Sequence, residues 1–161
     1  MGTEIERKFL VRNDSWRHGA RGVTCRQGYL TLDRHRLVRV RVMGDEAYLT
    51  IKAETGPIAR REYEYPIPRD DAEEMLVHLC ERPFIEKRRY TLLYRGIEWI
   101  IDEFSGDNEG LIVAEVELER EDQEVVLPEW AGEEVSLDPR YLNFNLIKYP
   151  YGQWPKETEE R

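Results

Sequence analysis

The first strand-like segment of this sequence carries a row of charges. Residues 4–8 read Glu-Ile-Glu-Arg-Lys. Side chains alternate between the two faces of a strand, so Glu4, Glu6 and Lys8 share one face while Ile5 lies on the other. Carboxylates are the oxygen ligands that Mg²⁺ and Mn²⁺ prefer, and an ammonium group binds phosphate as a point charge. The segment therefore combines groups for a divalent metal with a group for an anion.

Later segments repeat this pattern with like charges in register. Arg39 and Arg41 share one face of a strand-like segment, and so do Glu115 and Glu117. An antiparallel sheet with one wet face explains any single row. Like charges along a strand nevertheless repel unless opposite charges lie across from them, so the rows are better explained as two halves of one site. The basic groups in these rows are Lys8, Arg39, Arg41, Lys52, Arg60, Lys87 and Arg89.

The elements that would position these rows are mostly strands. Alternation of apolar and polar residues predicts eight of them, over residues 4–11, 25–31, 37–43, 47–53, 60–67, 85–94, 98–104 and 111–119. Short connections favour antiparallel pairing, and eight strands are enough to close a barrel. If the charged faces point inward, the buried charges must be paired or bind ions. A polyphosphate together with Mg²⁺ or Mn²⁺ satisfies both halves of such an interior.

Helices are expected to cover the apolar outer faces of this barrel. Asp70 and Glu73 fit a capping box at the start of one helix, which ends before Pro83. A shorter helix is predicted after Asp138-Pro139, running to Leu146. The fold is thus predicted to be mainly β (α+β), a closed eight-stranded antiparallel barrel with helices packed outside.

The composition narrows the class of protein. The 161 residues suit one domain, predicted over 1–150 with a polar, frayed tail to residue 161, and the net charge of −9 disfavours wholesale binding to nucleic acid or anionic membranes. The N-terminus resembles no signal peptide, and no apolar run has the length of a membrane span. Cys25 and Cys80 lack metal-type spacing, and the three histidines, His18, His35 and His78, are expected on the surface. We expect a cytoplasmic protein.

Eight motifs in order along the chain resemble those of the CYTH superfamily, also called triphosphate tunnel metalloenzymes. Glu4-Ile5-Glu6-Arg7-Lys8 resembles its ExExK signature, and Gln27-Gly28-Tyr29-Leu30 resembles its QGYL strand. The remaining matches are Arg39-Val40-Arg41 (RxR), Thr50-Ile51-Lys52 (TxK), Arg60 with Glu62 and Glu64 (RxExE), Lys87 to Tyr90 (KxRY), the isolated Asp102 and Glu115-Val116-Glu117 (ExE). Residues 130–135 and 141–143 resemble the closing segment of the family.

The resemblance implies a tunnel that binds a triphosphate with one or two Mg²⁺ or Mn²⁺ ions. The implied metal ligands are Glu4, Glu6, Asp102, Glu115 and Glu117. The implied phosphate-binding and catalytic residues are the seven cations Lys8, Arg39, Arg41, Lys52, Arg60, Lys87 and Arg89. Supporting roles are implied for Glu62, Glu64 and Tyr29.

The activity implied most directly is metal-dependent hydrolysis of inorganic triphosphate to pyrophosphate and phosphate, as in the short bacterial members. Adenylate cyclase, hydrolysis of an organic triphosphate such as thiamine triphosphate, and non-catalytic polyphosphate or nucleotide binding stay open as alternatives. The partner is a small molecule, and the oligomeric state is left open with a homodimer as one alternative. One departure concerns residues 144–148, Phe-Asn-Leu-Ile-Lys, where the family carries smaller residues at the closed end.

Overall fold

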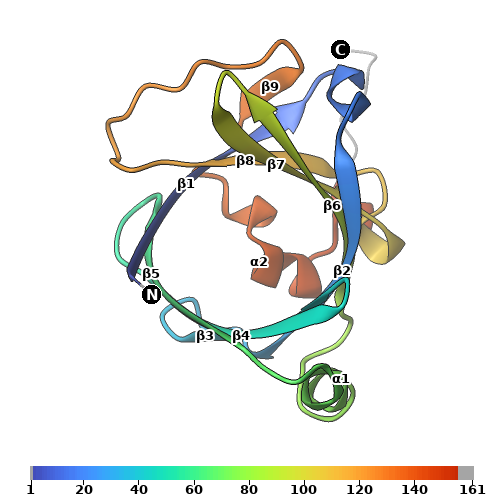
Figure 1. Cartoon of the computed structure of the whole chain (residues 1–161). Helices are drawn as coiled ribbons and strands as arrows, with labels where there is room; N and C mark the ends of the chain where they lie inside the picture. Colours follow the sequence, from blue (N-terminus) through green and yellow to red (C-terminus); the bar gives the residue numbers. More distant parts are fainter. Residues whose placement is uncertain (1, 156–161) are drawn as a thin grey trace.

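The computed structural model, which describes residues 2–155, is a closed antiparallel barrel (Figure 1). Within this range nine strands form one sheet. They are β1 (Gly2–Val11), β2 (Arg21–Thr31), β3 (Leu37–Met43), β4 (Glu46–Glu54), β5 (Ala59–Pro66), β6 (Ile85–Tyr94), β7 (Ile97–Phe104), β8 (Ile112–Glu117) and β9 (Ala131–Glu134). Neighbouring strands follow the order β5-β4-β3-β2-β6-β7-β8-β1, and pairing of β1 with β5 closes the ring. This confirms the predicted eight-stranded barrel, with β9 added beside β1.

Closure depends on β1, which pairs with two other barrel strands along different parts of its length. Its first half pairs with β5, where Glu4 faces Arg60, and its second half pairs with β8, where Lys8 faces Glu115. Strands of a barrel must tilt and stagger to close, and this shift of partner along β1 is the stagger. It brings the acidic and basic rows of three strands to one place.

Helix α1 (Arg69–His78) lies outside the barrel and covers β3 and β4. Its buried residues Ala72 and Leu76 pack against the outward-facing Val40 and Val42. The expected capping box was wrong, because the N-cap is Pro68, two residues before Asp70, and no side chain caps the helix. Acidic residues in the first turn still interact favourably with the helix dipole.

The second helix differs from the prediction in both bounds and position. The 3₁₀ turn Pro139–Tyr141 and α2 (Asn143–Lys148) are separate because Leu142 between them has extended backbone angles. Figure 1 shows α2 within the ring of strands rather than outside it. The segment from Phe144 to Lys148 therefore occupies the interior, with Lys148 exposed.

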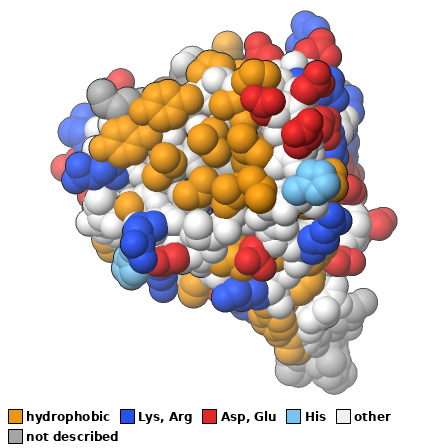
Figure 2. All heavy atoms as spheres, turned by 90° about the horizontal axis from the view of Figure 1, so that it is seen from below, with side chains coloured by type: hydrophobic (Ala, Val, Ile, Leu, Met, Phe, Trp, Pro, Cys, Tyr) orange, Lys and Arg blue, Asp and Glu red, His pale blue; other side chains and the backbone are white. Residues whose placement is uncertain are grey.

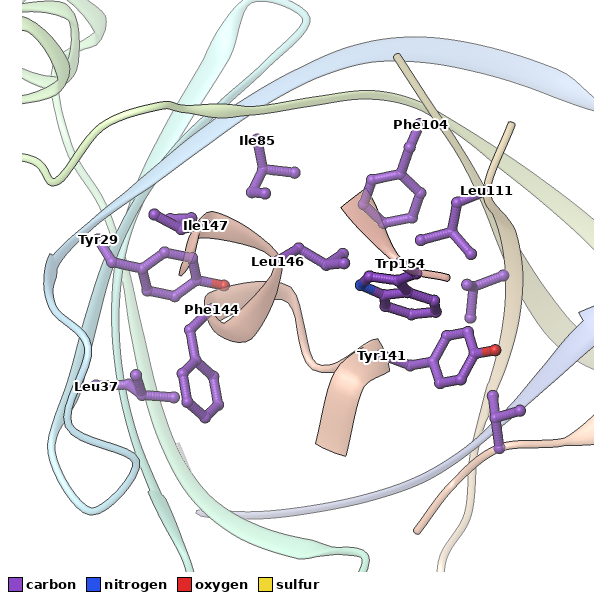
Figure 3. Close-up of a cluster of buried hydrophobic side chains, with 12 residues drawn as sticks. Tyr29, Leu37, Ile85, Phe104, Leu111, Tyr141, Phe144, Leu146, Ile147 and Trp154 are labelled. Carbon is purple, nitrogen blue, oxygen red and sulfur yellow. The ribbon is translucent and has the colours of Figure 1, made fainter. Parts of the chain in front are cut away.

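An apolar plug closes one end of the barrel around α2 (Figure 3). Phe144, Leu146 and Ile147 of α2 pack against barrel residues such as Tyr29 and Ile85. Trp154 packs edge-on against Tyr141, with ring centroids 5.0 Å apart. The expectation of a frayed tail from residue 152 was thus wrong for the part before 156, because Trp154 is buried in this plug. Residues 156–161 of the predicted tail lie outside the described range.

The outer faces of the strands are mainly apolar, as predicted, and two groups of strands are covered. Besides the strands under α1, an apolar cluster covers residues of β1, β7 and β8, in which Trp130 packs edge-on against Trp99 of β7 and Trp16 packs edge-on against Tyr90 of β6. Figure 2, viewed from the side of α1, shows an apolar patch that stays open. Ile51 on β4 and Tyr65 on β5 are 41% and 52% exposed on this outer surface. No helix in residues 2–155 has the length and apolar character needed to cross a membrane.

Candidate active site in the barrel interior

A cavity of about 400 Å³ lies inside the barrel, between the plug and the opposite mouth. Its wall brings together fourteen predicted site residues from seven strands. They are Glu4, Glu6, Lys8, Tyr29, Arg39, Arg41, Lys52, Arg60, Glu62, Glu64, Lys87, Arg89, Glu115 and Glu117. The period-2 alternation of each strand turns every second side chain inward, which is why residues distant in sequence meet here.

The cations in this wall are removed from water. Arg39, Arg41 and Lys87 are each less than 9% exposed. Burial lowers the Arg41 pKa to about 10, and the positive charges of Arg39 and Arg89 add to this shift. The Lys52 pKa is also lowered, first by burial and then by the positive charge of Arg39. Cations held close together and desolvated in this way are stabilised by a multiply charged anion. The buried Arg39 Nε forms no hydrogen bond with any described residue, which leaves it for such a ligand.

Asp102 is placed behind the cations rather than on the cavity wall with the other implied metal ligands. Its carboxylate lies 2.8 Å from Lys87 Nζ and accepts two hydrogen bonds from the Arg89 guanidinium at 2.9 Å. Burial alone would raise the Asp102 pKa, but Arg89 and Lys87 together hold that pKa well below its usual range. Both oxygens are engaged and the residue is 1% exposed, so the geometry favours a role in holding Lys87 and Arg89.

The remaining carboxylates form an acidic wall on β1, β5 and β8. Glu6 lies directly opposite Glu117, and Lys52 Nζ lies 3.0 Å from Glu4 Oε1 and 3.7 Å from Glu62. Burial and the charge of Glu4 raise the pKa of both Glu62 and Glu117. These carboxylates repel one another, which a bound cation would relieve.

The donor set of the acidic wall suits Mg²⁺ or Mn²⁺, because every group in it is a carboxylate. The buried Glu4 Oε1 accepts no hydrogen bond from any described residue, although Lys52 is close. Within residues 2–155, no three carboxylate, imidazole or thiol side chains already surround one point as metal ligands. The chemistry therefore fits a divalent ion, whose binding would draw these side chains together.

Two residues that contact cations of the cavity were missed as site residues by the sequence reasoning, Asn143 on the cavity wall and the fully buried Gln27 behind it. Gln27 and Asn143 were noted only as letters of motifs, yet Lys87 Nζ donates to Asn143 Oδ1 at 2.7 Å and Arg41 Nε donates to Gln27 Oε1 at 3.3 Å. The signal was present, since a glutamine or asparagine among apolar residues needs buried hydrogen-bond partners. Figure 3 shows the Tyr29 side chain pointing toward α2, and its hydroxyl oxygen accepts a hydrogen bond from Gln27 Nε2 at 3.1 Å.

The family model described as the CYTH domain matches residues 2–146. The chain belongs to the CYTH family. This CYTH protein is 52% identical over 151 residues to an inorganic triphosphatase of Acetivibrio thermocellus. The match covers 94% of this chain and 97% of the relative.

Two further comparisons agree with the family assignment. An inorganic triphosphatase of Nitrosomonas europaea is 42% identical over 147 residues, which cover 88% of this CYTH protein and 94% of the relative. The solved structure of the inorganic triphosphatase NE1496 superimposes with a TM-score of 0.64 at 38% identity, covering 91% of this chain and 95% of that one.

Proposed function

We propose that this CYTH protein hydrolyses inorganic triphosphate to pyrophosphate and phosphate inside the barrel, with Mg²⁺ or Mn²⁺ as cofactor. The observation that carries the proposal is the cavity itself, of about 400 Å³, whose wall holds seven cations together with the carboxylates of the acidic wall. The names of two relatives at 52% and 42% identity support inorganic triphosphate as the substrate.

The protein's own groups supply mainly positioning and charge. Arginine binds phosphate oxygens through two parallel hydrogen bonds, whereas lysine acts as a point charge. Groups such as Arg39, Arg41 and Lys8 would neutralise charge on the transferring and leaving phosphates, which is the main requirement for phosphoryl transfer. Glu4, Glu6, Glu115 and Glu117 would hold the metal ion. When bound, that ion supplies charge neutralisation and activates water as a nucleophile.

Neighbouring residues on β1 provide a matched test of the inward-facing assignment. Lys8 lines the cavity, whereas Arg7 lies on the outer surface and pairs with Glu134. We expect Lys8→Ala to raise the KM for tripolyphosphate about 100-fold, because a buried charged partner of phosphate contributes about 1.5–3 kcal/mol. Arg7→Ala should change KM by less than about twofold, since an exposed ion pair contributes little. Steady-state kinetics give the KM of both variants. Similar KM values for Lys8→Ala and Arg7→Ala would contradict the inward-facing assignment of Lys8.

The titration of Lys87 predicts a pH dependence of substrate binding. Burial, only partly opposed by Asp102, lowers the Lys87 pKa from its ordinary 10.5 to about 8. A triphosphate favours the charged amine, so KM should rise above pH 8 by up to about tenfold per pH unit. In the ligand-free protein, the same titration should increase stability as the pH rises. Above pH 8 Lys87 loses its proton in the folded protein, whereas the unfolded chain keeps that proton up to the ordinary pKa of 10.5. The free energy of unfolding should therefore increase with pH in this range.

The control for this pH effect is Lys87→Arg, which keeps its charge throughout the range. We expect its KM to stay level between pH 8 and 9.5 after correction for the ionisation of the substrate. An identical rise of KM with pH in the variant and in the wild type would show that another group is responsible.

A further inference from the structure

Two carboxamide side chains connect the plug helix to the cations of the cavity. Gln27 lies on β2, and Asn143 is the first residue of α2. The amide nitrogen of Gln27 donates hydrogen bonds to Asn143 Oδ1 at 3.0 Å and to Tyr29 Oη at 3.1 Å. Asn143 Oδ1 also accepts the hydrogen bond from Lys87 Nζ at 2.7 Å. The Asn143 Oδ1 atom of α2 thus accepts hydrogen bonds from side chains of both β2 and β6.

All hydrogen-bonding positions of the Gln27 carboxamide are used. Its oxygen accepts from Arg41 Nε at 3.3 Å and from the Cys25 thiol at 3.7 Å, while its nitrogen makes the two bonds already described. A primary amide offers two donors and two acceptor lone pairs, so four partners saturate it. The side chain is 0% exposed. A buried polar network in which every group is satisfied fixes the orientation of its members.

The members that this network fixes face the cavity. Lys87, Arg41 and Tyr29 all line the cavity wall. A bond at Nε holds a guanidinium group while leaving its two terminal nitrogens for phosphate oxygens. Lys87 is held from two sides, by Asn143 and by Asp102 at 2.8 Å, so its direction depends on α2 as well as on the barrel.

We propose that Asn143 and Gln27 are positioning residues for the substrate: Asn143 sets the direction of Lys87, and Gln27 sets that of Arg41 and Tyr29. Helix α2 then has two roles, because it closes the barrel with its apolar side chains and orients cations with its first residue. This inference rests on the proposed function, since it assigns these residues to the binding of inorganic triphosphate.

A double-mutant cycle tests whether Asn143 acts through Lys87. Asn143→Leu removes the acceptor while keeping a similar size, and we expect it to raise the KM for tripolyphosphate about tenfold, with a smaller change in kcat. In a Lys87→Met background the same substitution should change kcat/KM by less than about twofold, because residues that act through one another are not additive. Equal losses in both backgrounds, or no loss in either, would overturn the proposal.

A control variant separates positioning from general stability of α2. Asn145, two residues later, donates to Pro139 O at 2.8 Å and holds the helix without contacting the cations. Asn145→Leu should lower the midpoint temperature of thermal unfolding. Any loss of kcat/KM that it causes should be the same in the wild-type and Lys87→Met backgrounds. If Asn143→Leu does not fold, Asn143→Ala, which introduces no bulk, is used in the same cycle with the same expected results.

The cycle is measured in two ways so that it does not depend on turnover. Calorimetric titration with inorganic tripolyphosphate gives a Kd for each variant, and phosphate release gives kcat and KM. A wild-type protein that binds tripolyphosphate without hydrolysing it would overturn the proposed function, while the cycle in Kd would still decide the positioning role. Additive Kd values would overturn the positioning role alone.

Discussion

Asp102→Asn is expected to lower the free energy of unfolding by about 3–5 kcal/mol, because it leaves Lys87 and Arg89 buried without their shared counter-charge. The carboxylate contacts both cations at 2.8–2.9 Å and is 1% exposed, so it is their buried counter-charge. Urea denaturation at pH 7 measures this loss. Adding tripolyphosphate should restore part of it, since the ligand supplies negative charge to the same cations and binds only the folded state.

The neighbouring Glu103 is the control for this substitution. It faces outward on β7 and pairs with Arg17 on the surface. Exposed ion pairs contribute at most about 1 kcal/mol, so Glu103→Gln should change stability little. The comparison also distinguishes two roles for Asp102. If Asp102→Asn were to weaken metal binding and leave stability as in Glu103→Gln, Asp102 would be a metal ligand, as the family resemblance implied.

Glu117→Gln is expected to reduce metal-dependent turnover by at least about 100-fold, the upper range seen even for residues that only support metal ligands. Glu117 lies in the acidic wall opposite Glu6. The ligand-free protein should at the same time become more stable at pH 7, because burial and the charges of Glu4 and Glu6 raise the Glu117 pKa and so disfavour its charged form in the fold. Activity with a series of Mg²⁺ and Mn²⁺ concentrations, combined with thermal unfolding, measures both effects.

The control for Glu117→Gln is Glu119→Gln, two residues further along the chain. Both residues are exposed, but Glu119 follows the end of β8 and is not among the residues of the cavity wall, whereas Glu117 is. Glu119→Gln should leave turnover and metal dependence unchanged. If Glu117→Gln kept wild-type turnover at an unchanged metal concentration for half-maximal rate, the metal role of the acidic wall would be wrong.

The sequence predicted the barrel well because alternation is a local property. Each strand of the barrel was found to within four residues, and β3 and β6 had the expected bounds. The inward direction of Arg39 and Arg41 followed from the same alternation. Alternation does not show which residues face each other on neighbouring strands. For this reason Asp102 was interpreted as a metal ligand and not as the partner of Arg89, which lies directly across from it.

The plug was harder to predict because it depends on contacts between distant parts of the chain. Phe144 and Ile147 have a helical spacing, but no local pattern shows that they and Trp154 fill the open end of the barrel. Local signals were also misleading at α1, where Pro68 precedes the helix and Asp70 lies inside its first turn. Strand β9 was noted only as a family motif, since four residues are too few for a periodic pattern.

The most direct test of the account is phosphate release from inorganic tripolyphosphate, pyrophosphate and ATP, each with and without Mg²⁺ or Mn²⁺. We predict rapid release from tripolyphosphate that requires the metal, yields pyrophosphate and phosphate, and exceeds the rates with the other two substrates. Cyclic AMP from ATP, or no release from tripolyphosphate with either metal, would contradict a barrel that hydrolyses inorganic triphosphate.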